Sequence, residues 1–390
     1  MRSEFFNVLL VIGMAGAGFA SILLGQPVEI TITGQRGFPV ALRSFQGAAG
    51  VEAMETVSAD LRRSGRIRFQ PTPAGAFRIE GNAQPGNLQA RVVSPDGNVV
   101  LERKYNGGTA VALAHRFADD AVAAITGVPG ISQSRLAFSV KKTGRKELYI
   151  CDYDGANLQQ VTHDQSISVS PALSRDGRAL AYTGYLNGFA DIYLIDLPTG
   201  RRQKVVAEPG TNTGASFSPS GDRIACTMSA SGNPELFVVP VRGGRAKRLT
   251  QSRFVESSPC WSPDGRSIVF VSDATGAPQL FVISAEGGRP QRIDTGHAYC
   301  VEPDWAPNGH LIAFNVREGG RNQVAVHDLR TRSTRVLTNG ANAETPVWGA
   351  DSQHIAYVQS GSLYVHDVET NTRTSVISGF GEVSEPAWSR

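Results

Sequence analysis

The sequence predicts a mainly β protein: a six-bladed β-propeller preceded by a small α/β domain and an N-terminal signal or anchor segment. Three observations predict this fold. The last two-thirds of the chain repeat with a period near 44 residues, each period holds four short strand patterns, and partial units at its two ends add up to one more unit. We expect the N-terminal segment over 1–26, the α/β domain over 27–130 and the propeller over 131–390.

The composition is that of an ordinary globular protein. Of the 390 residues, 41% are apolar and 19% are charged, so the chain is long enough for two domains with cores of their own. The 42 glycines favour many turns and short strands. The net charge is only +3, and no basic run is interleaved with aromatic residues, which argues against nucleic acid as a partner.

The N-terminal segment is typical of export. Arg2 precedes an apolar stretch, and no charged residue occurs between Phe5 and Val28. Small residues around Ala20 suit cleavage by a signal peptidase. The run from Phe5 to Gly25 is also long enough to cross a bilayer, so a retained anchor is the alternative. In either case we expect the body of the protein outside the cytoplasm.

The segment from Pro27 to Gly130 has no repeat and predicts alternating strands and helices. The expected strands are 28–32, 38–42, 88–93 and 99–105, of which the last two flank the turn 95–98. The expected helices are 51–64, which Gly65 ends, and 109–126, with Thr109 as N-cap. No element is assigned to the Pro- and Gly-rich stretch between Phe69 and Leu88, and 127–130 is the linker.

The repeat is anchored by a motif of the type Pro-x-Trp-Ser-Pro-Asp-Gly. Its copies begin at residues 171, 215, 259, 303, 346 and 386, which are 44, 44, 44, 43 and 40 residues apart. After each complete motif come an apolar triplet, such as Ile268–Phe270, and a third strand, such as Leu280–Ile283. Fourth strands are expected around Val205, 249–250, 293 and 337–338. This is the strand content and period of propeller blades.

The sixth blade is split between the two ends of the repeat. Residues 135–138, 148–150 and 161–162 supply a second, third and fourth strand, whereas Pro386–Ser389 supplies a first strand alone. We therefore expect the last strand to close the ring beside Arg135–Phe138, because closure removes free sheet edges.

Tryptophans and cysteines carry no ligand chemistry in this pattern. All four tryptophans, Trp261, Trp305, Trp348 and Trp388, occupy the same repeat position, which favours packing between blades over a stacking platform. The cysteines are Cys151, Cys226, Cys260 and Cys300, and they form no CxxC pair. Buried free thiols and disulfides both remain open.

At this point the sequence resembles the TolB family, the periplasmic propellers of the Tol–Pal system. The specific motifs are Leu61-Arg-Arg-Ser-Gly65, the strand within Pro39–Phe45, and the junction formed by His115, Asp119 and residues 126–138. The resemblance covers nearly the whole exported chain. It departs between Phe69 and Leu88, where the family usually carries a fuller section, and this departure bears on whether the α/β domain keeps the family's inner-membrane contact.

The resemblance implies a non-enzymatic adaptor. Such proteins bind the lipoprotein Pal through the propeller and the inner-membrane protein TolA through the N-terminal region, in envelope integrity and cell division. It implies a periplasmic location, with inner-membrane anchoring if the N-terminal segment is retained, and we expect a monomer. Val28, Ile30 and Ile32 are either an ordinary strand or part of a segment that docks to TolA.

Propellers bind partners through the loops at one end of the ring. In this repeat those are the loops between the fourth and first strands and between the second and third strands. The residues expected near that mouth are Phe254, Glu256, His297, Tyr299, Glu302, Asn342, Glu344 and Glu385. They are either solvated loop residues or partner contacts.

The alternatives are a propeller related to prolyl-oligopeptidase-type enzymes and a propeller that binds peptidoglycan or small ligands. The sequence has no G-x-S-x-G, HExxH, GxGxxG or Walker motif. His115 and Asp119 have no third ligand nearby in sequence, so we expect a local helix pair or a hydrogen bond at the domain junction, not a metal site. No catalytic residue, metal or cofactor is expected.

Overall fold

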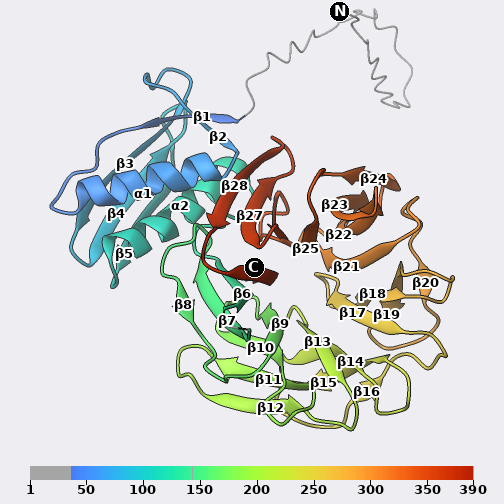
Figure 1. Ribbon diagram of the computed structural model, residues 1–390. Coiled ribbons are helices and arrows are strands. Elements are labelled where there is room, and N and C mark those ends of the chain that lie inside the picture. The colour runs from blue at the N-terminus through green and yellow to red at the C-terminus, as the bar shows by residue number, and fades with distance from the viewer. Residues whose placement is uncertain (1–36, 143, 390) are drawn as a thin grey trace, which may run out of the picture. The chain divides into compact units, whose positions relative to one another are not determined.

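The computed structural model describes residues 37–142 and 144–389. The expected signal or anchor segment and the strand 28–32 lie outside the described residues. Within them the chain forms two helices and 29 strands, and none of these helices is long and apolar enough to cross a membrane (Figure 1).

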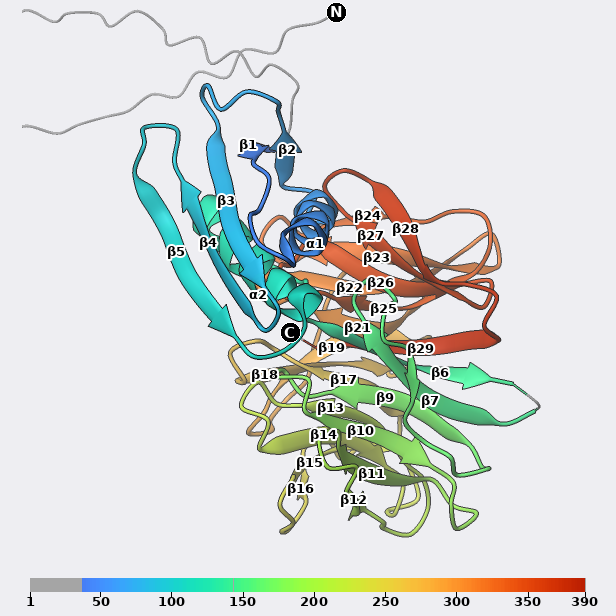
Figure 2. The same ribbon diagram turned by 90° about the vertical axis from the view of Figure 1, so that its left-hand side faces the viewer.

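The first part is a five-stranded sheet with two helices on one face (Figure 2). The strand order is β2-β1-β3-β4-β5, with β1 parallel to both of its neighbours and the other pairs antiparallel. The elements are β1 (Phe38–Leu42), α1 (Gly50–Arg63), β2 (Ile67–Phe69), β3 (Phe77–Gln84), β4 (Asn87–Val93), β5 (Val99–Asn106) and α2 (Ala110–Thr126). Val57, Leu61, Leu113 and Phe117 are fully buried between the helices and the sheet.

Both predicted helices are confirmed to within one residue, and so are the strands β1, β4 and β5. Thr109 caps α2 as predicted, since its hydroxyl accepts a hydrogen bond from the backbone N–H of Ala112 at 3.2 Å. The strands β2 and β3 were missed. In β3 the inward side chains are Ile79 and Ala83, and Gly81 between them lies against the ring of Phe45, so the apolar alternation is too weak to read.

The second part consists of six four-stranded antiparallel sheets around a central axis, which confirms the predicted six-bladed propeller (Figure 1). From the inner to the outer strand, the first three blades are β9 (Ser168–Leu173), β10 (Ala179–Gly184), β11 (Asp191–Asp196) and β12 (Arg202–Val206); β13 (Asn212–Phe217), β14 (Arg223–Met228), β15 (Glu235–Pro240) and β16 (Lys247–Arg248); and β17 (Glu256–Trp261), β18 (Ser267–Ser272), β19 (Gln279–Ser284) and β20 (Gln291–Arg292). The other three are β21 (Cys300–Trp305), β22 (Leu311–Glu318), β23 (Arg321–Asp328) and β24 (Ser333–Val336); β25 (Ala343–Trp348), β26 (His354–Gln359), β27 (Ser362–Asp367) and β28 (Thr372–Ile377); and β29 (Glu382–Trp388), β6 (Arg135–Lys141), β7 (Lys146–Asp152) and β8 (Gln159–Gln160).

The ring closes through the last strand of the chain. The strand β29 pairs antiparallel with β6, with Trp388 opposite Leu136 and Val383 opposite Val140. Each inner strand also contacts the inner strand of the next blade all the way round, and β29 contacts β9. The predicted closure is therefore confirmed, and it leaves no inner strand unpaired.

The fourth strands lie slightly upstream of their predicted positions in most blades. The strands β8, β16 and β20 are pairs of exposed polar residues that end just before Val161, Leu249 and Ile293. Those apolar residues still donate a backbone hydrogen bond to the third strand, as from Leu249 to Leu236 at 2.8 Å. The apolar signal thus marks where the chain turns inward, not the strand itself.

The tryptophans pack between blades, as expected. All four are at most 7% exposed. Trp261 is clustered with Leu236 of the preceding blade, and its indole N–H donates to the carbonyl of Ser216 there at 3.1 Å. All four cysteines are buried free thiols.

Candidate partner-binding face and central channel

The two ends of the propeller ring differ in what covers them. We call the end with the loops between fourth and first strands and between second and third strands the mouth face, and the opposite end the turn face. The α/β part packs on the turn face, because the propeller residues that it contacts all lie at that end. Tyr153 directly follows a third strand, Asp367 is the last residue of another third strand, and Gln353 lies in a turn between a first and a second strand. The mouth face is free of the α/β part (Figure 2).

A buried carboxylate joins the α/β part to the closing blade. Asp60 of α1 accepts a hydrogen bond from the hydroxyl of Tyr153 at 2.6 Å and lies 2.7 Å from Nδ1 of His115. Arg63, one turn further along α1, lies over the ring of Tyr153 and pairs with Asp154 at 3.2 Å. Asp60, His115 and Tyr153 are each at most 7% exposed, so water is excluded from these hydrogen bonds.

The expected local pair between His115 and Asp119 is wrong, and the other expectation, a hydrogen bond at the junction, is confirmed in a different form. The side chain of His115 bonds to Asp60 of α1 and not to Asp119. Asp119 instead accepts the backbone N–H groups of Ser132 and Gln133, at 2.7 and 3.0 Å, and so fixes the linker that leads into the propeller.

A second junction contact explains the motif that ends in Gly65. Gly65 has a φ of +65°, and a Cβ there would lie 2.1 Å from a carboxylate oxygen of Asp367 and 2.8 Å from the amide nitrogen of Gln353. The same Asp367 lies near the buried His354, whose Nε2 is 3.9 Å from a carboxylate oxygen of Asp367 and whose Nδ1 is 2.6 Å from one of Asp351. Only glycine combines this backbone conformation with so close an approach.

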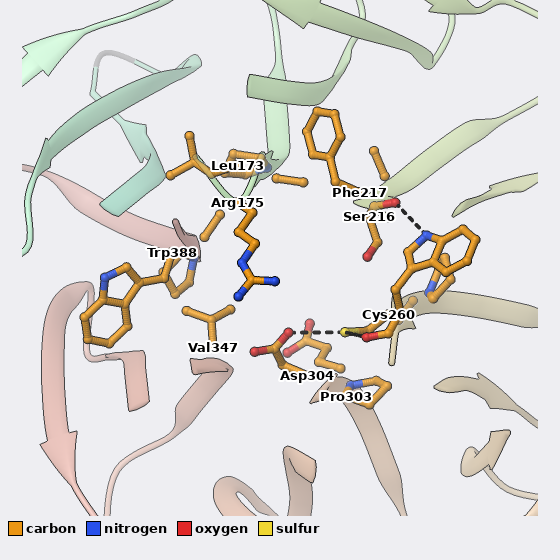
Figure 3. Close-up of a pocket in the computed structure, with 18 of the residues that line it drawn as sticks. Leu173, Arg175, Ser216, Phe217, Cys260, Pro303, Asp304, Val347 and Trp388 are labelled. Carbon is orange, nitrogen blue, oxygen red and sulfur yellow. Dashed lines mark hydrogen bonds between the residues drawn. The ribbon is translucent and has the colours of Figure 1, made fainter. Parts of the chain in front are cut away.

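The central channel contains a cavity of about 570 Å³. Its wall is built from the inner strands of all six blades and the turns that follow them, and Pro129 of the linker also lines it. Figure 3 shows Arg175, Cys260 and Asp304 among the side chains around the cavity. The cavity therefore occupies the part of the channel toward the turn face, away from the predicted mouth.

The residue at one position of every inner strand has a left-handed backbone. In five blades it is followed by proline, and φ lies between +49° and +54° at Ser170, Ser258, Glu302, Thr345 and Glu385. Gly214 fills the position in the remaining blade with φ of +67°. The strand register shifts at each of these positions, so every blade carries a bulge that turns this residue into the channel wall.

Two of these residues link neighbouring blades through their carboxylates. Glu302 accepts the backbone N–H of Thr345 in the next blade at 3.1 Å, and Glu385 accepts that of Ser170 at 2.9 Å. Burial raises the pKa of Glu302, and the nearby charges of Glu344 and Glu385 raise it further. The carboxylate of Glu302 thus lies where an additional negative charge nearby is unfavourable.

Sequence reasoning missed three residues of the cavity: Arg175, Cys260 and Asp304. Asp304 accepts the backbone N–H of Trp348 at 2.7 Å and the thiol of Cys260 at 3.3 Å. Arg175 could have been found, because it stands where three other blades have proline in the turn after the first strand. None of the described histidines lines the cavity.

The eight residues predicted near the mouth separate into three groups. Glu302 and Glu385 lie in the channel wall, and Glu256 is buried at 4% exposure, where its carboxylate accepts the hydroxyl of Ser252 at 2.8 Å. The other five, all at least partly exposed, lie on the mouth face: Phe254, His297, Tyr299, Asn342 and Glu344.

The mouth-face residues are held by contacts between loops. Arg317 lies over the ring of Tyr299, with 4.3 Å between its guanidinium carbon and the ring centre. Asn322 donates its backbone N–H to Asn342 at 3.0 Å and its side-chain amide to Glu344 at 3.2 Å. These loops are therefore ordered before any partner binds, which lowers the entropic cost of association. Val28, Ile30 and Ile32 lie outside the described residues.

The comparisons with known proteins agree on one family. A family model described as the TolB beta propeller domain matches residues 122–390. The chain is 39% identical over 103 residues to a TolB homologue of Chlorobaculum tepidum, covering 26% of this chain and 24% of that protein. It is 28% identical over 203 residues to the Tol-Pal system protein TolB of Bordetella pertussis, covering 43% of this chain and 46% of that protein. These matches span between about a quarter and a half of the relatives' lengths.

Among solved structures, the crystal structure of TolB from Acinetobacter baumannii has a TM-score of 0.79 to this chain at 25% sequence identity. The similarity covers 91% of this chain and 97% of that one. It therefore includes the α/β part as well as the propeller.

Proposed function

The chain belongs to the TolB β-propeller family, and from that premise we propose that it is a non-enzymatic adaptor of a Tol–Pal-like system. In this proposal it lies in the periplasm and binds a peptidoglycan-associated, Pal-like lipoprotein through the mouth face of the propeller. Its N-terminal region, including Val28, Ile30 and Ile32, engages a TolA-like inner-membrane protein. The complex serves envelope integrity and cell division.

The observation that carries the proposal is the similarity to a solved TolB over nearly the full length of both chains. The geometry supports different roles for the two ends of the ring. The turn face is covered by the α/β part, whereas the mouth face presents ordered loops with aromatic and acidic side chains such as Tyr299 and Glu344. Ordered loops around a rigid scaffold are how propellers bind other macromolecules.

The channel supports binding over catalysis. The carboxylates of Glu302, Glu385 and Asp304 are engaged in hydrogen bonds to the protein itself. A hydrolase would need a nucleophile beside a base, and the described part of the cavity wall has no histidine.

The proposed partner contact is tested with the full chain and a purified Pal-like lipoprotein, using affinity measurements on charge-reversal variants. We expect Glu344→Lys to weaken binding by about tenfold or more, because Glu344 lies on the mouth face. Glu286→Lys is the matched control: Glu286 is an exposed carboxylate on the turn face, at 77% side-chain exposure, and its reversal should leave affinity unchanged. Equal affinity for both variants would remove Glu344 from the interface, and absence of any lipoprotein binding would remove the adaptor function.

Glu302 calls for a gentler change, because its carboxylate holds the next blade. Glu302→Gln keeps an oxygen that can accept from Thr345 while removing the charge, so it separates a charge contact with the partner from a structural role. Weaker lipoprotein binding with unchanged thermal stability would place Glu302 in the contact. Unchanged binding would make it a structural residue only.

The N-terminal contact is tested by removing residues 28–32. We expect the deletion to abolish capture of a TolA-like protein and to leave lipoprotein binding intact. Capture at the wild-type level would show that these residues are not the docking segment.

A further inference from the structure

A basic hairpin protrudes at the mouth face of the closing blade. The turn between β6 and β7 carries Lys141, Lys142, Arg145 and Lys146, and the first three of these are exposed. Of these four cations, only Lys141 forms an ion pair within the described residues, with Glu382 at 3.8 Å, and both of these side chains are about half or more exposed. The hairpin therefore presents a net positive charge to solvent.

The two central cations have no carboxylate partner among the described contacts. Lys142 lies over the ring of Phe380, 3.3 Å from its centre, and Arg145 donates to the side-chain oxygen of Gln165 at 3.5 Å. The nearest acid of β7, Glu147, instead accepts the backbone N–H of Gln165 at 2.8 Å and the hydroxyl of Thr162. Lys142 and Arg145 are thus available to an anion from outside.

Exposed apolar side chains occur in two mouth-face loops of the next blade, one of which pairs with this hairpin. Ile167 is 45% exposed, Leu186 is 36% exposed and Phe189 is 70% exposed, the highest value among the large apolar side chains of the described residues. Ile167 forms a β-bridge with Lys146, and its carbonyl accepts the backbone N–H of Tyr185 at 3.0 Å, which joins the two loops. We call Lys142, Arg145, Ile167, Leu186 and Phe189 the basic–apolar patch.

The chemistry of this patch favours a lipid surface over a peptide. Exposed Phe and Leu flanked by Lys and Arg are the combination that inserts apolar atoms between headgroups while cations contact their phosphates. The residues lie in exposed loops of the mouth face, and none of them lines the central cavity. We propose that the basic–apolar patch binds the surface of a membrane that contains anionic phospholipids.

The test uses the full chain and flotation with vesicles, either phosphatidylcholine alone or phosphatidylcholine with phosphatidylglycerol. We expect tighter binding to the anionic vesicles, weakened by added salt. Lys142→Glu with Arg145→Glu should reduce binding to anionic vesicles by about tenfold or more, since each cation near such a surface contributes roughly a fivefold factor. Arg242→Glu with Arg245→Glu makes the same charge change at two exposed arginines on the turn face and should have no effect.

A site-specific readout separates the patch from any contribution of the N-terminal segment, which all variants share. The four native tryptophans are buried, so a tryptophan introduced by Phe189→Trp reports its own surroundings. We expect brominated lipids to quench it, and not to quench a tryptophan introduced by Val99→Trp at an exposed site in the α/β part.

Two results would overturn the proposal. The first is equal binding of the charge-reversed variant and the wild type to anionic vesicles, and the second is an absence of quenching at position 189. If the first result came with loss of lipoprotein capture in the Lys142→Glu, Arg145→Glu variant, the patch would be a protein-docking surface instead.

Discussion

At the scale of single residues, the junction between the α/β part and the propeller depends on a few buried polar groups. Asp60 bonds to His115 within its own part and to Tyr153 of the closing blade. A buried carboxylate that loses a donor retains its cost of burial, so each of these bonds stabilises the junction by more than an exposed bond would.

Replacement of Tyr153 by phenylalanine tests that contact. Tyr153→Phe removes only the hydroxyl that donates to Asp60, and we expect it to lower the free energy of unfolding by about 1–3 kcal/mol. Tyr149→Phe is the matched control on β7, because the hydroxyl of Tyr149 bonds to Gln160 at a partly exposed site. Denaturant unfolding of both variants measures the difference, and equal losses would mean that the Asp60 bond has no special weight.

A second buried group gives the protein a pH dependence. Burial alone would lower the pKa of His354, but the charges of Asp351 and Asp367 outweigh it and raise the pKa above 6.5. The folded state then binds this proton more tightly than the unfolded chain. The stabilisation is complete below pH 6.5 and is lost as the pH rises through the raised pKa.

We therefore expect the melting temperature to fall as the pH rises above 6.5, and the fall to be smaller in His354→Gln. His366 is the opposite case, since burial lowers its pKa. Its contribution increases as the pH rises toward 6.5, and His366→Gln should change the slope only on that acidic side. A slope above pH 6.5 that is identical in wild type and His354→Gln would contradict the assignment.

The sequence predicts which side chains lie along the channel and its mouth better than it predicts whether each one is at the mouth or inside the channel. The sequence predicts Glu302 and Glu385 at the mouth because the repeat assigns them to the loop between fourth and first strands. The left-handed conformation at that position turns them into the channel wall instead, and a conformation of this kind leaves little trace in the sequence when the residue is not glycine. The partner of His115 was also out of reach, since Asp60 lies 55 positions away.

At the scale of secondary-structure elements, local signals determined what could be predicted. Helix α2 has both a side-chain cap and an apolar face, and its bounds are predicted to within one residue. The strand β3 contains Gly81 and Asn82, which interrupt the usual alternation of apolar and polar side chains. It is nevertheless the central strand of the sheet, and Gly81 packs against the ring of Phe45. Elements that depend on tertiary contacts are therefore the ones the sequence does not reveal.

The cap of α2 gives a prediction at this scale. Thr109→Ala removes the hydroxyl that accepts from Ala112, and we expect a loss of about 1 kcal/mol in the free energy of unfolding. Thr56→Ala is the control inside α1, where the hydroxyl only bonds back to the carbonyl of Glu52 on an exposed surface. Circular dichroism during urea unfolding compares them, and equal stability of the two variants would mean that the cap does not contribute.

At the scale of the whole molecule, closure of the ring couples the end of the chain to the rest of the propeller. The strand β29 is the inner strand of a blade whose other strands begin near residue 135. Trp388 donates its indole N–H to Ser134 at 2.7 Å, across 254 positions of sequence. The repeat made this closure predictable, because the two partial units together held the strands of one blade.

Substitution of the closing tryptophan tests the coupling. Trp388→Ala should lower the free energy of unfolding by about 3–5 kcal/mol, as much as Trp348→Ala in an internal blade, because both rings are buried. Calorimetry should show the propeller unfolding in one transition in both variants. If Trp388→Ala instead produced only a small early transition with the main one unshifted, the last strand would be dispensable and the ring would not be closed cooperatively.

The central claim is that a partner binds the mouth face while the turn face holds the α/β part. Hydrogen–deuterium exchange of the full chain, with and without a Pal-like lipoprotein, tests it most directly. The account predicts slower exchange in the mouth loops 251–256, 294–302 and 338–345, and no change in the turns 242–246 and 286–290. Protection confined to the turn face, or none anywhere at a saturating lipoprotein concentration, would contradict it.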